Sequence, residues 1–164
     1  MKIKIYFAGP LFTTYQRQFI EKCALKLRDE GFEVFVPHEE FSIKNDDSVG
    51  DKIEVSNRQR AINVFEKDYE GVSWANVLIV MLDGAQVDDG TASEIGIFTE
   101  QMLNDINQEK LNIFGLSSDM RVGPNAEGGE SKVLNYFTVG AIYKVGGKIY
   151  NNIQNIILEL KKLT

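Results

Sequence analysis

The chain has 164 residues, a normal length for one domain and too short for two domains with full cores. Its composition, with 43% hydrophobic and 26% charged residues, 14 Gly and 3 Pro, excludes a disordered, collagen-like or disulfide-dense protein. The formal net charge is −6 and no basic cluster interrupts the chain, so neither nucleic acid nor an anionic membrane is expected as a partner.

The cysteine content and the hydropathy pattern favour a cytoplasmic location. The single cysteine, Cys23, has no partner for an internal disulfide, which is typical of a reducing compartment. No apolar run approaches the roughly 20 residues of a membrane span. Residues 3–7 have the pattern of a strand and not of a signal peptide. We therefore expect one cytoplasmic domain that covers residues 1–164.

Strands and helices are expected to alternate along the chain. Apolar runs bounded by Gly or Pro predict strands, and apolar residues spaced by three or four predict helices. The predicted strands are residues 3–7, 32–36, 77–82 and 111–115, with a short fifth strand at 148–149. The predicted helices cover residues 15–30, 58–72, 88–107, a short stretch from 135, and 153–160. Residues 38–57 and 116–132 are predicted to be polar loops.

This alternation determines the predicted fold class. Residues 77–82 are all apolar, as in a strand buried on both faces of a parallel sheet. Strands that alternate with helices of this length predict βαβ units, and so an α/β fold with a parallel sheet and helices on both faces. Ligands of such sheets bind at the carboxyl ends of the strands. Polar loops follow the predicted strand ends at 8–14, 83–91 and 116–132, and chemistry is expected there.

An acidic segment opens the third predicted helix. Asp88 and Asp89 precede Gly90, and Glu94 falls in the first turn, where the helix dipole would keep its pKa low. An ionised carboxylate at this place could act as a nucleophile toward an electrophilic carbon. However, Thr91-x-x-Glu94 also has the spacing of a capping box, and the two aspartates are typical turn and cap residues. Residue types alone leave both interpretations open.

Three further side chains could take part in chemistry. Asp68 lies beside the apolar stripe of the second predicted helix and is either a solvated charge or, next to a buried stripe, a proton donor with a raised pKa. Tyr6 is expected in the core with its hydroxyl as a polar handle. His38 is the only histidine, so a metal site with several His or Cys ligands is excluded. Phosphate-binding glycine loops are absent as well.

Taken in chain order, these residues resemble the nucleoside 2-deoxyribosyltransferase family over nearly the whole chain. The matching stretches are Tyr6-Phe7-Ala8-Gly9-Pro10-Leu11-Phe12, Asp68, Leu82-Asp83-Gly84-x-x-x-Asp88-Asp89-Gly90-Thr91-Ala92-x-Glu94-Ile95-Gly96, Asp119-x-Arg121 and Asn135. The segment Asp-Gly-Thr-Ala-x-Glu-Ile-Gly is the most specific of them. The resemblance implies a three-layer, flavodoxin- or Rossmann-like fold with a five-stranded parallel sheet.

The resemblance also implies a double displacement on 2'-deoxynucleosides and free nucleobases, with no metal or organic cofactor. Glu94 would attack the anomeric carbon, and a second base would attack the resulting ester from the same face. Asp68 would exchange a proton with the base, Asp88 would help to hold the substrate, and Tyr6 would orient Glu94 through its hydroxyl. Such transfer requires one ionised carboxylate at the sugar and one proton donor at the leaving group, as in retaining glycosidases.

Further residues are expected to bind the substrate by the same resemblance. They are Gly9, Phe12, Asp89, Gly90 and Asn135. The last of these would reach the site of a neighbouring subunit, which implies a homo-oligomer. The chain ends in Thr164, whereas well-known members end in an aromatic residue whose carboxylate enters a neighbour's site.

Two other functions remain open at this point. An N-glycosidase would pass the same glycosyl-enzyme to water, acting on 2'-deoxynucleosides or their 5'-monophosphates, and a sensing domain would bind nucleosides or nucleotides without catalysis. The loop at 9–14 has no basic residue before Arg17 to pair with a phosphate, which favours nucleosides over nucleotides. The loops at 8–14 and 38–57 are expected to set base specificity.

Overall fold

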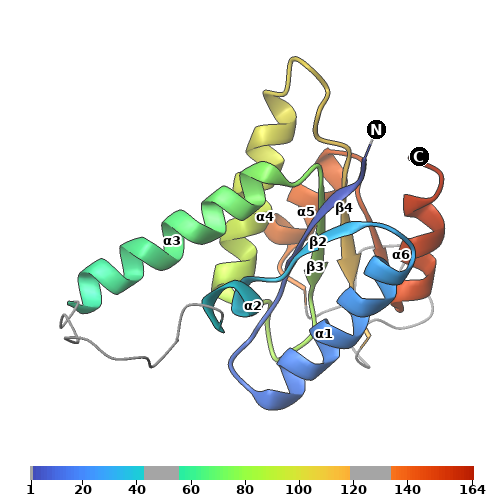
Figure 1. Cartoon of the computed structure of the whole chain (residues 1–164). Helices are drawn as coiled ribbons and strands as arrows, with labels where there is room; N and C mark the ends of the chain where they lie inside the picture. The colour runs from blue at the N-terminus through green and yellow to red at the C-terminus, as the bar shows by residue number, and fades with distance from the viewer. Residues whose placement is uncertain (1, 43–55, 119–133) are drawn as a thin grey trace.

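A computed structural model describes residues 2–42, 56–118 and 134–164 (Figure 1). Five parallel strands form one sheet in the order β2-β1-β3-β4-β5. The strands are β1 (Lys4–Ala8), β2 (Glu33–Phe35), β3 (Val77–Met81), β4 (Asn112–Leu116) and β5 (Lys148–Tyr150). The helices are α1 (Thr14–Asp29), α2 (Pro37–Ser42), α3 (Asn57–Trp74), α4 (Asp89–Leu103), α5 (Tyr136–Lys144) and α6 (Ile153–Leu160). The predicted five-stranded parallel sheet flanked by helices is confirmed.

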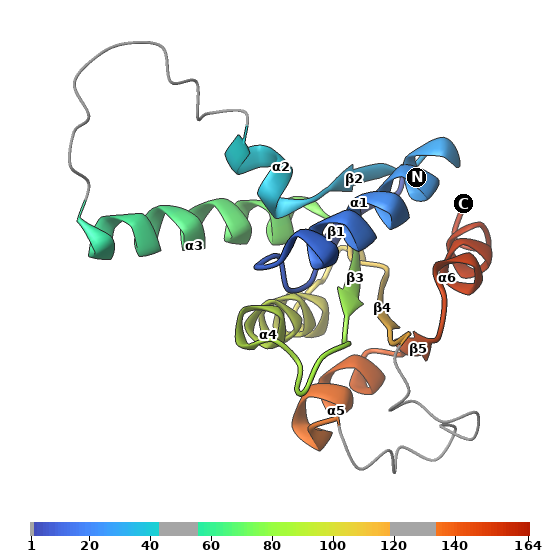
Figure 2. The same ribbon diagram turned by 90° about the horizontal axis from the view of Figure 1, so that it is seen from below.

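The sheet separates two apolar cores. Side chains of a strand point alternately to its two faces, so Ile5 and Phe7 of β1 pack with α1 and α6, whereas Tyr6 and Ala8 pack with α3, α4 and α5. Figure 2 shows α1 and α6 on one side of the sheet and α4 and α5 on the other. The order 2-1-3-4-5 reverses direction between β1 and β3, where ligands of such sheets bind. Tyr6 therefore lies on a strand beside this switch point.

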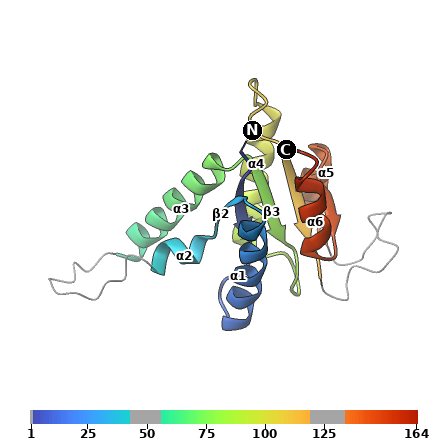
Figure 3. The ribbon, with the colours of Figure 1, turned by 45° about the vertical axis from the view of Figure 1, so that its right-hand side comes forward.

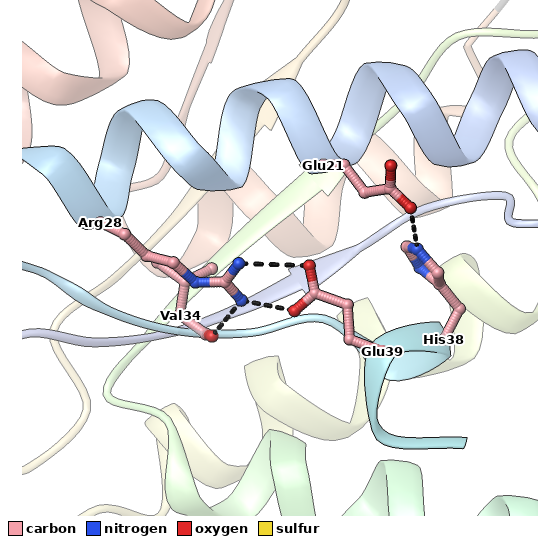
Figure 4. Close-up of polar contacts among 5 residues, drawn as sticks. All are labelled: Glu21, Arg28, Val34, His38 and Glu39. Atoms are coloured by element: carbon pink, nitrogen blue, oxygen red, sulfur yellow. Dashed lines mark hydrogen bonds and ion pairs between the residues drawn. The ribbon is translucent and has the colours of Figure 1, made fainter. Parts of the chain in front are cut away.

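Helix α2 occupies the start of a segment that the sequence predicted to be a loop, and that prediction is wrong for residues 38–42. Pro37 suits a first helical turn because its fixed backbone angle is helical and its missing N–H would be unpaired there. Two contacts fasten α2 to α1 (Figure 4): His38 Nε2 lies 2.7 Å from Glu21 Oε1, and Glu39 pairs with the Arg28 guanidinium, Nη2 to Oε2, at 2.6 Å. The rest of the predicted loop up to residue 55 lies outside the described residues.

Helix α3 is less buried than its apolar pattern predicted. Its predicted apolar stripe ends in Val72, which is buried, but Ile62, Phe65 and Tyr69 are exposed. The rings of Phe65 and Tyr69 stack on each other at 5.8 Å between centroids. Figures 1 and 3 show why: the N-terminal half of α3 extends away from the sheet. Only the last turns of α3 therefore pack on the core.

The remaining boundaries differ from the predictions by a few residues. Helix α4 ends at Leu103 and not near residue 107, because Asp105 accepts hydrogen bonds from the backbone N–H groups of Asn107 and Lys110 and so holds a turn there. The short fifth strand is present as β5. Among the described helices, none combines the length and the hydropathy that a membrane crossing requires.

Candidate active site

Tyr6 lies at the centre of the candidate site. Its side chain is fully buried on the face of β1 that packs against α3 and α4, and its ring stacks on Phe35 of the neighbouring strand at 5.3 Å between centroids. Its hydroxyl donates a 2.5 Å hydrogen bond to Glu94 Oε1. The hydroxyl contact that the resemblance implied for these two residues is therefore present, and burial raises the pKa of Tyr6 so far that the phenol stays a donor.

Glu94 reaches this hydroxyl from the second turn of α4, and the sequence placed it wrongly in the first turn. The N-cap of α4 is Asp88, whose Oδ2 accepts from the Thr91 backbone N–H at 3.0 Å and from the Thr91 hydroxyl at 3.2 Å. The predicted capping box of Thr91 and Glu94 does not form. Because Asp88 performs the capping, the carboxylate of Glu94 is available for the contact with Tyr6.

The protonation of Glu94 also differs from the prediction. The helix dipole was expected to keep its pKa low, but burial raises the pKa of Glu94 to about 8, against an opposing effect of the Tyr6 hydrogen bond. The charges of Asp68 and Asp88 raise it further. The dipole acts mainly within the first turn, whereas loss of hydration acts wherever a carboxylate is enclosed. Desolvation is therefore the larger effect at this position.

Asp68 approaches the same hydroxyl from α3. Burial raises the pKa of Asp68 to about 6, while the nearby Tyr6 hydroxyl and the charge of Lys67 act in the opposite direction. Its Oδ1 is buried and has no hydrogen-bond partner among the described residues. The pKa is raised as expected for a carboxyl group beside a buried stripe, although only the Val72 end of that stripe is buried, and the role of Asp68 as a proton donor stays a prediction.

Gly71, which was not among the residues predicted to form the site, explains how the ring of Tyr6 fits beneath α3. A Cβ atom at this position would lie 2.8 Å from Tyr6 Cε2 and 2.9 Å from Phe35 Cε1. Glycine in a helix interior costs about 1 kcal/mol relative to alanine, so its presence in α3 is a signal of close approach. The absence of a side chain at Gly71 lets the helix that contains Asp68 lie directly on Tyr6.

Other residues that were predicted to bind the substrate lie at the start of α4 or between β1 and α1. Asp89 is exposed and accepts a hydrogen bond from the Gly90 backbone N–H at 2.9 Å. A Cβ atom on Gly9 would lie 2.8 Å from Ile20 Cδ1 and 2.9 Å from Met81 Cβ, so glycine is needed there for packing. Phe12 lies between β1 and α1 with 77% of its surface exposed. None of these contacts tests the predicted role in substrate binding.

Asn135 is the N-cap of α5. Its Oδ1 accepts from the backbone N–H groups of Phe137 at 2.8 Å and Thr138 at 3.4 Å, and its side chain is exposed. Its predicted role in a neighbouring subunit's site is not tested by these contacts. Asp119 and Arg121, the other downstream matches, lie outside the described residues, as does most of the predicted loop at 116–132.

The described site thus brings together one phenol and two carboxyl groups from β1, α3 and α4. No three His, Cys, Asp or Glu side chains in the described ranges are grouped so that they could hold a metal ion. The two carboxyl groups are coupled through charge and through the shared tyrosine, so their pKa values belong to the pair. Such a pair can hold one proton at neutral pH while its other member stays ionised.

Comparison with known proteins identifies the family. The sequence profile described as nucleoside 2-deoxyribosyltransferase matches residues 5–136. A curated relative, an uncharacterized protein of Ureaplasma parvum serovar 3, is 30% identical and is aligned over 98% of each chain.

Solved structures with the same fold agree with this match. A conserved protein from Enterococcus faecalis V583 superposes with a TM-score of 0.71 at 24% identity over 100% of both chains. A 2-deoxyribosyltransferase from Bacillus psychrosaccharolyticus gives a TM-score of 0.63 at 22% identity, covering 94% of this chain and 90% of its own. The CMP N-glycosidase of Clostridium botulinum gives 0.53 at 18% identity, covering 98% and 99%. The chain belongs to the nucleoside 2-deoxyribosyltransferase family.

Proposed function

We propose that the protein transfers 2-deoxyribose between nucleobases through a covalent intermediate on Glu94. The observation that supports this most strongly is the 2.5 Å hydrogen bond from the Tyr6 hydroxyl to Glu94 Oε1, because it fixes one carboxylate oxygen and leaves the other for attack. Asp68 lies close enough to influence the same pair of groups and has a pKa suited to proton transfer near neutrality.

In the first half-reaction, the free Glu94 oxygen forms a bond to the anomeric carbon as the bond from that carbon to the base breaks. The electron pair of the broken bond stays on the base, which takes the proton of Asp68 and leaves neutral. An ester between Glu94 and the sugar remains, with Asp68 ionised. In the second half, Asp68 takes a proton from the incoming base, which attacks the same carbon and releases Glu94 as carboxylate. Two displacements at one carbon retain its configuration.

This sequence of steps requires one proton on the carboxyl pair. With pKa values of about 6 and about 8, Asp68 and Glu94 together hold one proton between these pH values. Because Glu94 has the higher pKa, the substrate-free protein carries that proton on Glu94, and the reactive arrangement requires its transfer to Asp68, which leaves the charge on Glu94. The Tyr6 hydrogen bond lowers the free-energy cost of this transfer because it stabilises the ionised form of Glu94.

The substrate would be held by residues around this pair. Asp88 would bind the sugar with the carboxylate oxygen that does not accept the capping hydrogen bonds. Gly9 and Phe12 lie on the loop that follows β1, and Asp89 and Gly90 are the first two residues of α4; all four would contact the base and sugar. The expected substrates are nucleosides, since Arg17, the first basic residue after β1, uses its Nη1 to bind the Leu11 carbonyl at 2.7 Å.

We further propose that a second copy of the chain covers the exposed face of α3, with Asn135 of one copy reaching the site of another. Three exposed apolar residues at helical spacing form that face, Ile62, Phe65 and Tyr69. The helix has Arg58 and Arg60 near its start and Glu66 and Glu70 near its end. An antiparallel pair of such helices about a two-fold axis places opposite charges next to each other.

Base exchange is the direct test of the proposed activity. The protein is incubated with deoxyinosine and free adenine, and the products are separated by chromatography. Transfer predicts deoxyadenosine together with hypoxanthine, and the Glu94→Ala variant is expected to form neither while it keeps its fold. A wild-type protein that forms no new deoxynucleoside from any combination of a purine or pyrimidine deoxynucleoside with a free base contradicts the proposal.

An N-glycosidase is the second candidate, because the CMP N-glycosidase of Clostridium botulinum has the same fold. Water would replace the second base in the same mechanism, so the assay above would yield hypoxanthine alone. A sensing domain would bind nucleosides equally well after the Glu94→Ala substitution and would give neither product. The cytoplasm stays the predicted location for either enzyme.

A further inference from the structure

Lys110 contacts the C-terminal end of α3, far from the loops that follow β1 and β3. The proposed mechanism does not use its side chain. It lies in the turn between α4 and β4 and is half-buried. Its ammonium group donates hydrogen bonds to three backbone carbonyls at the end of α3: Val72 at 3.0 Å, Ser73 at 2.8 Å and Ala75 at 2.5 Å. The last carbonyls of a helix have no partner within the helix, so Lys110 satisfies them and lies at the negative end of the helix dipole.

The same ammonium group also contacts α4. It lies 4.7 Å from the centroid of the Phe98 ring, a cation–π distance. A second link joins the helices nearby, where Gln101 Nε2 donates to Ser73 Oγ at 2.9 Å. Lys110 is itself held in place, since its backbone N–H binds Asp105 Oδ2 at 2.5 Å and the next residue, Leu111, binds the Asn76 carbonyl at 2.7 Å.

The two contacts of Lys110 fall at corresponding places on the two helices. Val72 lies four residues after Asp68, and Phe98 lies four residues after Glu94. Residues four apart lie above one another on the same face of a helix. Lys110 therefore joins α3 and α4 one turn beyond each carboxyl group. A shift of either helix at this point would change the distance of that carboxyl group from the Tyr6 hydroxyl.

We propose that Lys110 is a positioning residue that fixes the spacing of Asp68 and Glu94 across the Tyr6 hydroxyl by joining α3 to α4. Its importance for turnover rests on the proposed function, but its effect on the two carboxyl groups does not. Both groups owe their raised pKa mainly to burial between these helices. If the contacts of Lys110 with α3 and α4 are lost, water can enter between the helices, and water stabilises the ionised form of each carboxyl group.

The Lys110→Met variant tests this, because methionine keeps much of the apolar stem and cannot donate a hydrogen bond. Carboxyl-carbon NMR titration of the substrate-free protein is expected to show the pKa values of Glu94 and Asp68 lowered by about half a unit or more. Lys26→Met, which removes an exposed lysine from α1 on the other face of the sheet, is the matched control and is expected to leave both values unchanged. In the exchange assay kcat is expected to fall about tenfold, with KM changed less than about twofold.

Two conservative variants keep the test decisive if methionine prevents folding. Lys110→Arg retains the charge and the donors and is expected to restore most of the wild-type titration. Phe98→Leu removes the ring contact, keeps an apolar side chain in the core, and is expected to shift the titrations in the same direction as Lys110→Met by a smaller amount. Folded variants whose carboxyl groups titrate as in the wild type overturn the proposal. Absence of base exchange by the wild-type protein would instead contradict the proposed function, and the titration result would still decide the role of Lys110.

Discussion

At the residue scale, Glu94 and Asp68 differ from ordinary surface carboxyl groups because each is enclosed between helices and each is within the influence of the Tyr6 hydroxyl. Burial without a cationic partner raises the free energy of the ionised form, so that either group alone would stay protonated and could not act as a carboxylate. The tyrosine offsets part of that cost for Glu94 through a 2.5 Å hydrogen bond. The pair therefore keeps one ionised and one protonated member near neutral pH.

The pH dependence of kcat/KM should follow from this pair. With pKa values of about 6 and about 8, the rate is expected to rise as pH increases through 6, where the pair loses its first proton, and to fall as pH increases through 8, where it loses the second. Base-exchange rates measured from pH 4 to 10 check this. In Asp68→Asn the alkaline fall should disappear, and a profile identical to that of the wild type would show that Asp68 is not the proton donor.

The raised pKa of Glu94 also has a consequence for stability. Its pKa rises from an ordinary 4.5 to about 8, so between these values the folded chain binds a proton that the unfolded chain releases. The free energy of unfolding therefore falls as pH rises through this window. Glu94→Gln removes this loss and keeps an acceptor for Tyr6, so the variant is expected to be inactive and, at pH 9, more stable by on the order of 2 kcal/mol.

Urea denaturation of both proteins at pH 9 and at pH 4 measures this difference. The stability gain of Glu94→Gln should shrink toward zero at pH 4, where the wild-type carboxyl group is protonated in both states. Equal stability of the two proteins at pH 9 would show that Glu94 is not buried as the account requires.

At the element scale, the site depends on how closely α3 packs against β1. Gly71 permits this contact, because a Cβ there would lie within 2.9 Å of the rings of Tyr6 and Phe35. Gly71→Ala is expected to displace the Tyr6 ring, to lower exchange activity at least about tenfold and to lower stability by about 1–3 kcal/mol, although alanine alone favours a helix.

Gly140→Ala in α5 is the matched control, since a Cβ there has no neighbour within 4 Å. It is expected to raise the melting temperature slightly, as alanine favours the helix, and to leave activity unchanged. Activity assays and thermal melts of both variants check this pair of predictions. A Gly71→Ala protein that is as active as the Gly140→Ala protein would contradict the proposed contact.

The elements also show what could be predicted from the sequence. The apolar run at 77–82 and the alternation of strands and helices were sufficient to predict the parallel sheet, because an all-apolar strand of this length must be buried on both faces. The cap of α4 stayed open between Thr91 and the two aspartates, because Asp88 and Thr91 are both good cap residues and spacing does not choose between them. The low pKa predicted for Glu94 was wrong, since burial depends on how α3 and α4 close over Tyr6 and no local pattern contains that information.

At the scale of the whole molecule, α3 has an apolar face that the described part of the chain leaves exposed. Phe65 is 57% exposed and Tyr69 46% exposed, and both lie on the stripe that the sequence pattern assigned to the core. A stripe of this kind on a helix indicates a partner surface. Covering it with a second copy would also enclose the region around Asp68.

The Phe65→Glu variant tests this arrangement. We expect the wild-type protein to sediment as an oligomer and the variant to shift toward the monomer, with exchange activity lowered at least about tenfold because the site is no longer enclosed. Leu158→Glu on α6 replaces an equally exposed apolar residue and serves as the control. Analytical ultracentrifugation distinguishes the outcomes, and an unchanged sedimentation coefficient for Phe65→Glu would contradict the use of α3 as the interface.

The covalent role of Glu94 is tested most directly by trapping. A 2'-fluorinated nucleoside analogue slows an oxocarbenium-like displacement, so a glycosyl-enzyme should accumulate and survive proteolysis for peptide mass spectrometry. We predict that the peptide containing Glu94 gains the mass of the fluorinated sugar and that the Glu94→Gln protein gains none. A protein that exchanges bases yet has the sugar on another residue, or on none, would contradict the account.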